Sequence, residues 1–244
     1  MSEPRRRGGR AARLSTHPPA PADPMSDDAL TREGLRAPRA RARLLVLACG
    51  ALAREIGALC RLNGWDEVTL HCLPAILHNR PERIGPAAEA ALDALPHDRA
   101  FLAYADCGTG GGLERLAARR GIGLLPGAHC YAFFDGVAAF EARGETTAFY
   151  LTDFLARQFD AFVTRPLALD RHPELRDSYF AGYDRLVHLA QVDDPATAEL
   201  AHDHADGLGL AFERRLTGYG DLATALEREV TAARSGVPSA ARAD

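Results

Sequence analysis

The chain contains no lysine, since all 29 of its basic residues other than histidine are arginine. A Walker A phosphate loop requires a lysine, as does a Schiff base to pyridoxal phosphate or to a class I aldolase substrate, so these chemistries are excluded. Cysteine is scarce, with five among 244 residues. An odd number of cysteines without a secretory stretch predicts reduced thiols in the cytoplasm. No apolar run reaches the ~18 residues that a membrane helix needs, so we expect a soluble protein.

Charge is distributed unevenly along the chain, although the net charge is only −4. Residues 1–43 contain ten Arg against five acidic residues, whereas residues 44–244 contain 19 Arg against 28 acidic residues. The larger part of the chain is therefore acidic, which argues against nucleic acid as its main partner. Any cation that binds a substrate must be an arginine or a metal ion.

The first forty residues are rich in arginine and proline and contain few large apolar side chains. Such a segment cannot bury enough surface to offset the entropy of ordering, so residues 1–40 are predicted to be a disordered basic leader. The leader could contact RNA or an acidic surface, or it could be dispensable, with Met25 as the true start. We predict a single α/β domain over residues 41–230 and a flexible tail over residues 231–244.

From residue 44 onward, short runs of Leu, Val and Ile alternate with longer stretches of helical period, a pattern typical of repeated βα units. The predicted strands are Leu44–Ala48, Glu67–His71, Ala100–Ala105, Ile122–Leu125, Arg185–Ala190 and Leu210–Leu216. We therefore expect an α/β fold with a doubly wound, mostly parallel, Rossmann-like sheet of about six strands flanked by helices. The strands form either one sheet or two apposed lobes with a cleft between them, the second lobe spanning residues 165–230.

One long stretch, Thr146–Thr164, carries apolar side chains on a wide face and is predicted to be a helix. A helix this apolar is not stable alone, so it either crosses the sheet, which we favour, or forms a contact between the subunits of a homodimer.

Four cysteines follow the ends of successive predicted strands. They are Cys49, Cys72, Cys107 and Cys130. Because the carboxyl ends of parallel strands share one edge of a sheet, we expect these thiols near one crevice, together with His129. Thiolate and imidazole suit a transition metal, zinc in the first place. Packing of small residues at turns is an alternative, as is a single nucleophilic Cys beside His129.

A glycine-rich loop follows the third predicted strand, over residues 106–112. Gly108, Gly110 and Gly112 resemble the glycines of adenosylmethionine-dependent methyltransferases, but that family's loop follows the first strand. We favour a loop whose backbone N–H groups at Gly108, Thr109 and Gly110 approach an anionic ligand. Asp106 is then the candidate proton acceptor, with His129 as a second catalytic candidate.

The loop after the second predicted strand places an imidazole, an amide and a guanidinium in a row between two prolines. These are His78, Asn79 and Arg80. Arg80 could hold a carboxylate or phosphate with two hydrogen bonds, which predicts a small anionic substrate. Alternatively, Arg80 pairs with Glu82 in solvent.

Five motifs together resemble the uncharacterised family catalogued as domain of unknown function 1638. They occupy residues 47–50, 77–82, 104–108, 127–131 and 170–176. Members of that family tend to be encoded near corrinoid-dependent methyl-transfer systems, so the resemblance implies a role in one-carbon metabolism and a corrinoid protein as partner. With the strand-end argument this gives our hypothesis of a zinc-dependent methyl- or thiol-transfer enzyme. The alternatives are a non-catalytic metal-delivery or accessory protein and an adenosylmethionine-dependent methyltransferase.

Overall fold

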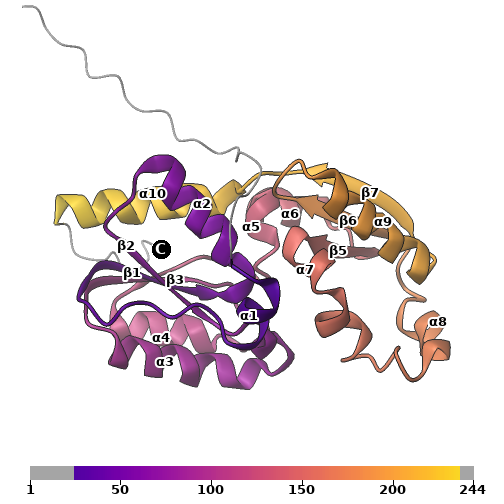
Figure 1. Ribbon diagram of the computed structural model, residues 1–244, viewed down its shortest axis with the longest axis horizontal. Coiled ribbons are helices and arrows are strands. Elements are labelled where there is room, and N and C mark those ends of the chain that lie inside the picture. Colours follow the sequence, from indigo (N-terminus) through magenta and orange to yellow (C-terminus); the bar gives the residue numbers. More distant parts are fainter. Residues whose placement is uncertain (1–24, 237–244) are drawn as a thin grey trace, which may run out of the picture.

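Two parallel β-sheets divide the chain into two lobes, of which the computed structural model describes residues 25–236 (Figure 1). The first lobe contains α1 (Asp27–Arg32), β1 (Ala42–Cys49), η1 (Gly50–Leu52), α2 (Ala53–Asn63), β2 (Val68–Leu73), η2 (Ala75–Asn79), η3 (Pro81–Arg83), α3 (Ile84–Ala94), β3 (His97–Ala103), α4 (Gly112–Arg120), β4 (Gly123–Leu124), α5 (Ala132–Asp135) and α10 (Gly220–Ser235). The second contains α6 (Val137–Arg143), β5 (Ala148–Thr152), α7 (Asp153–Arg157), η4 (Asp160–Thr164), η5 (Pro173–Leu175), α8 (Arg176–Tyr179), β6 (Arg185–Ala190), α9 (Pro195–Leu208) and β7 (Ala211–Leu216). The predicted α/β class with parallel, helix-flanked sheets is confirmed.

The first sheet has the strand order β2-β1-β3-β4, with every pair parallel. Its central strand is β1, whose residues 44–48 are fully buried because the run Leu-Leu-Val-Leu-Ala can fill both faces of a covered sheet. Figure 1 shows α2 and α10 on one face and α3 and α4 on the other. The chain is therefore doubly wound around β1, and the carboxyl ends of its strands meet at one edge.

The second sheet has the order β5-β6-β7 and is also parallel. One of its faces packs against α7 and α9 through a core that includes Leu186 and Leu208. The opposite face is smaller and contacts the aromatic rings of Tyr131 and Tyr150 through Val187. With this sheet the chain has seven strands in its described part, one more than the sequence predicted.

The additional strand is β5, which lies inside the stretch predicted as one long helix over residues 146–164. That prediction is wrong: β5 pairs with β6, Thr152 then caps α7 by accepting a hydrogen bond from Leu155 N at 3.2 Å, and a π-helical turn follows at η4. The residues Phe149–Leu151 are apolar enough to fit either the 3.6-residue period of a helix or the two-residue period of a strand. Pairing with β6 favours the strand. The second lobe therefore includes β5 and begins before residue 165, where the sequence predicted its start.

Residues 25–40 differ from the predicted disordered leader. They contain α1, whose Leu30 is 1% exposed, and Leu35 pairs with Cys72 of β2 in an isolated antiparallel bridge. Gly34 makes this approach feasible, because its φ is 73° and a Cβ there would lie 2.0 Å from the Cys72 carbonyl oxygen. Residues 1–24, the remainder of the predicted leader, lie outside the described residues.

The first helix of the described part contacts both lobes, and the last helix returns to the first lobe. Asp27 of α1 forms ion pairs with Arg54 of α2 at 3.0 Å and with Arg157 of α7 at 2.8 Å, so one carboxylate joins both lobes. After β7 the chain returns to the first lobe as α10, which covers β1 and includes residues 231–235 of the predicted tail. Residues 237–244 lie outside the described residues. Within the described part, no helix is long and apolar enough to cross a membrane.

Candidate functional site

A cavity of about 90 Å³ lies between the two lobes, at the carboxyl ends of β1, β2, β3 and β5. We call it the interlobe cavity. It is lined by Cys49, Ala51, Leu52, Pro74, Ala75, Leu77, His78, Ile84, Tyr104, Cys107, His129, Cys130, Tyr131, Phe134, Thr152, Leu155 and Phe162. The lining is mostly apolar, and its polar groups are thiols, imidazoles and hydroxyls. It occupies the position at which open α/β sheets bind ligands.

Cys107 and Cys130 meet in this cavity, with their Sγ atoms 3.0 Å apart. They do so because the loops after β3 and β4 run side by side, held by hydrogen bonds from Asp106 N to Gly127 O and from Cys107 N to Ala128 O, both 2.9 Å. Cys107 has a φ of 47°, a left-handed conformation that costs an L-residue about 1–2 kcal/mol. The paired loops hold the residue there, and such strain is typical of functional sites.

The two thiols have opposite tendencies to ionise. The hydrogen bond from the Cys130 thiol lowers the pKa of Cys107 well below its usual range, against the effect of burial, and a hydrogen bond from His78 lowers it further. The same contact with Cys107, followed by burial, raises the pKa of Cys130 well above its usual range. Cys107 is therefore the thiolate of the pair, and Cys130 is its hydrogen-bond donor.

The other two predicted metal ligands lie in different surroundings. Cys49 lines the interlobe cavity, where burial raises the pKa of its thiol to about 12 and Tyr104 is a hydrogen-bond partner. Cys72 is 1% exposed and packs in the core of the first lobe, outside the cavity lining. The structure thus brings three of the four predicted ligands to one cavity. Over residues 25–236, no three His, Cys, Asp or Glu side chains form a group that could hold a metal ion.

Asp106 is engaged by its own loop. Its carboxylate accepts hydrogen bonds from Thr109 Oγ1 at 2.8 Å, Gly111 N at 2.6 Å and Gly110 N at 3.2 Å. Although burial raises the pKa of Asp106, these bonds lower it overall. We expected the amides of Gly108, Thr109 and Gly110 to approach an anionic ligand. In this conformation Gly110 N donates to the Asp106 carboxylate and Thr109 N donates to the Asp106 carbonyl oxygen at 2.9 Å. Gly108 is exposed, and Asp106 lies outside the lining of the interlobe cavity.

The loop after β2 closes the cavity against the second lobe. His78 lines the cavity and its ring contacts Phe162 edge to face, with centroids 6.5 Å apart. Asn79 Nδ2 donates a hydrogen bond to Ala161 O at 3.3 Å. Arg80 is exposed at the end of η2, and no ion pair to it is found among the described residues, including Glu82.

His129 lines the cavity from the loop after β4. It is exposed and stacks on Tyr131 with ring centroids 5.0 Å apart, and Tyr131 in turn stacks on Tyr150 of β5 at 5.5 Å. His78 and His129 are therefore the imidazoles that line this cavity, and they come from different loops.

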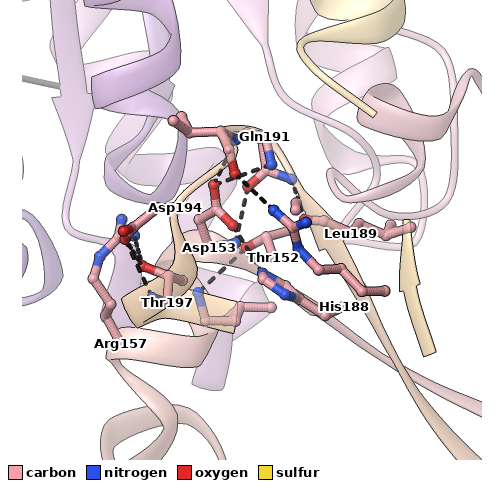
Figure 2. A network of polar contacts seen from close by, with 12 residues as sticks. Thr152, Asp153, Arg157, His188, Leu189, Gln191, Asp194 and Thr197 are labelled. Atoms are coloured by element: carbon pink, nitrogen blue, oxygen red, sulfur yellow. Dashed lines mark hydrogen bonds and ion pairs between the residues drawn. The ribbon is translucent and has the colours of Figure 1, made fainter. Parts of the chain in front are cut away.

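A buried polar network fixes the second lobe at the cavity (Figure 2). The Asp153 carboxylate accepts hydrogen bonds from Gln191 N and Val192 N, both at 3.0 Å, and lies 2.8 Å from His188 Nε2. Asp153 N donates in return to Gln191 Oε1 at 2.9 Å. The network ties the end of β5 to the end of β6, and so positions Thr152 at the cavity wall.

Several residues of the site were absent from the sequence predictions. Tyr104 directly follows β3, two residues before the predicted Asp106–Cys107 pair, so the strand-end argument could have included it. Thr152, Leu155 and Phe162 were missed because β5 was interpreted as helix. Outside the cavity lining, the sequence predictions also lacked Glu55, which is 5% exposed in α2 and whose pKa burial raises to about 7. A single acid in a helical stretch gives no signal that it will be buried.

Comparison with known proteins yields one match. A family model described as "Protein of unknown function (DUF1638)" matches residues 72–226, which include Cys107, Cys130 and the loop after β2. No curated protein and no solved structure matches the chain. Because the match covers well over half of the sequence, the chain belongs to the family of domain of unknown function 1638.

Proposed function

We propose that the protein is a group-transfer enzyme that binds a small molecule in the interlobe cavity and accepts a group from it on the sulfur of Cys107. The observation that carries this proposal is the Cys107–Cys130 contact of 3.0 Å at the wall of that cavity. A thiolate is the reactive form of cysteine, and the hydrogen bonds from Cys130 and His78 favour it at Cys107.

Different residues bind different parts of the substrate. Leu77, Leu155 and Phe162 offer an apolar surface to the transferred group, and we assign Arg80, which is exposed in the loop after β2, to hold an anionic end of the substrate. In the transfer, the Cys107 sulfur forms a bond to carbon, and the bond from that carbon to its leaving group breaks with both electrons going to the leaving group. Where the leaving group needs a proton, we assign that role to His129, which lines the cavity.

The setting that we propose is corrinoid-linked one-carbon metabolism in the cytoplasm. The motif resemblance supports the corrinoid link, with a methyl group on cobalt as donor and a corrinoid protein as partner. The five free cysteines support a reducing compartment. In this reaction the methyl–cobalt bond breaks, the methyl group passes to sulfur, and cobalt retains the electron pair as cobalt(I).

The experiment uses two methyl donors on the reduced full-length protein. Iodomethane tests whether Cys107 accepts a small group, and methylcobalamin tests whether a corrinoid can supply it. We expect one methyl group per chain with each donor, mapped to Cys107 by peptide mass spectrometry, and a cobalt(I) absorbance spectrum with the second. Cys107→Ser should abolish both reactions and Cys60→Ser should change neither. Methylation spread over the cysteines, or none at Cys107, would contradict the proposal.

A second candidate function is the binding or delivery of a soft metal ion such as zinc, as a cofactor or as cargo for a corrinoid system. The observation that favours it is that three thiols and two imidazoles line one cavity: Cys49, Cys107, Cys130, His78 and His129. Elemental analysis of protein made in zinc-replete medium tests it. One equivalent of zinc that Cys107→Ala and Cys130→Ala both remove, with Cys60→Ala retaining it, supports metal binding, and less than about a tenth of an equivalent refutes it.

A further inference from the structure

We propose that Cys107 and Cys130 form a thiol–disulfide exchange pair that reduces a small disulfide bound in the interlobe cavity. The inference shares with the proposed function the assignment of Cys107 as the attacking sulfur, and needs no methyl donor. It gives Cys130 a chemical role of its own, which group transfer to Cys107 does not.

The two sulfur atoms are already near bonding distance. Their separation is 3.0 Å, and a disulfide bond is about 2.05 Å long, so an approach of about 1 Å would join them. The hydrogen bonds between the loops, from Asp106 N to Gly127 O and from Cys107 N to Ala128 O, keep the two backbones together. The approach can therefore be made by the side chains while the loops stay paired.

The third thiol at the cavity is arranged differently. Cys49 has Tyr104 and the backbone N–H of Ala51 as its hydrogen-bond partners. Cys60 lies in α2, outside the cavity lining. Cys107 and Cys130 are thus the pair that the fold places for exchange, and Cys60 provides a matched control.

The reaction balances in two steps. The Cys107 thiolate attacks one sulfur of the disulfide, a mixed disulfide forms, and the first small thiol leaves as a thiolate that takes up from solvent the proton that Cys107 released when it ionised. The Cys130 sulfur then gives up its proton and attacks the Cys107 sulfur, and the second small thiol leaves with that proton. Two electrons pass from the protein thiols to the substrate, and the pair ends as an internal disulfide that an excess of a small thiol returns to its reduced form.

The cavity defines the class of disulfide. A volume of about 90 Å³ admits only a small molecule or one end of a larger one, and the lining residues include no acid or arginine. Apolar side chains such as Leu77 and Ile84 suit short carbon chains on either side of the sulfurs. We therefore expect small, uncharged disulfides to react faster than bulky or highly charged ones.

The test treats the reduced full-length protein, freed of reductant, with 2-hydroxyethyl disulfide and follows intact mass and peptide maps. The wild type should lose two hydrogens, release two equivalents of 2-mercaptoethanol and show a Cys107–Cys130 link. Cys130→Ser should stop at a mixed disulfide on Cys107. Cys107→Ser should react at least about tenfold more slowly, while Cys60→Ser matches the wild type.

The outcomes separate this inference from the proposed function. A wild-type protein that accumulates a stable mixed disulfide, or links another pair of cysteines, overturns the exchange pair. If iodomethane still labels Cys107 in that case, the proposed function stands. If Cys107 reacts with neither reagent, both fail. The wild-type peptide map decides the inference by itself, so it stays testable even where a serine variant does not fold.

Discussion

Cys107 Sγ lies 3.0 Å from Cys130 Sγ, although the two residues are 23 positions apart and follow different strands. The contact lowers the pKa of Cys107 and raises that of Cys130, so the two thiols ionise as a coupled pair. Removal of either sulfur should therefore alter the chemistry of the one that remains, and several predictions depend on this coupling.

Replacement of Cys130 by Ala removes the hydrogen bond with the largest effect on Cys107. We expect the pKa of Cys107 to rise from about 5 by at least about two units, which would leave about a tenth of it as thiolate at pH 6 and slow its alkylation by iodoacetamide there about tenfold. Labelling that is quenched at a series of times, followed by peptide mass spectrometry, measures the rate of alkylation at Cys107. Cys60→Ala serves as the control, and an unchanged Cys107 rate in Cys130→Ala would show that the contact does not favour the thiolate.

His78 makes the second hydrogen bond to Cys107, so His78→Gln should slow the same alkylation several-fold at pH 6. The matched control is His172→Gln, because His172 is an exposed imidazole of the second lobe that pairs with Glu174 at 3.2 Å, away from the cavity. Equal alkylation rates in the two variants would show that His78 does not favour the Cys107 thiolate.

Much of this arrangement could be predicted from the sequence. The positions of Cys49, Cys107 and His129 after strands are readable because a parallel sheet brings the ends of its strands to one edge. The same rule does not give the direction of a side chain, and Cys72, although it precedes the end of β2, points into the core. Which thiols meet depends on the pairing of the loops after β3 and β4, and no local pattern encodes that pairing.

The residues contributed by the second lobe could not be predicted. The residues Phe149–Leu151 fit the apolar pattern of a helix and of a strand equally well. Because a longer helical pattern follows them, the sequence predicted a helix there, with no indication of β5 or of Thr152 at the cavity wall. Asp106 preceded a glycine loop as expected, but its hydrogen bonds to that loop depend on the three-dimensional turn rather than on the order of residues.

Glu55 should make stability depend on pH. Burial raises its pKa in the folded protein to about 7, against 4.5 for the free group, so the folded state binds the proton more tightly than the unfolded chain. The resulting stability is fully present below pH 4.5 and is lost as the pH rises through 7, by up to about 3 kcal/mol.

Urea unfolding at pH 5.5 and pH 8.5 measures this loss. Glu55→Gln cannot ionise, so we expect it to be more stable than the wild type at pH 8.5 and to show a smaller difference between the two pH values. Glu199→Gln, a change at an exposed position of α9, should keep the wild-type pH dependence. A Glu55→Gln variant that keeps it as well would contradict the assignment.

Asp27 links the lobes through Arg54 and Arg157, and its side chain is 13% exposed. Asp27→Asn removes a charge from between two arginines, so we expect the free energy of unfolding to fall by about 1–3 kcal/mol. Urea denaturation measures the change, with Asp177→Asn as the control because the ion pair of that residue is at the surface. A loss no greater than that of the control would show that α1 does not hold the lobes together.

The central claim is that Cys107 is the reactive thiolate of the interlobe cavity, and the rate of iodoacetamide labelling at each cysteine as a function of pH tests it most directly. We predict that Cys107 is labelled first and that its labelling rate no longer rises with pH above pH 7. Cys60, with a pKa raised by burial to about 11, should still react faster with each step above pH 8. Unfolded protein, in which all five thiols are exposed, calibrates the intrinsic rates. If Cys107 is labelled no faster than Cys60 at pH 6, or follows the pH like an ordinary thiol, the account is wrong.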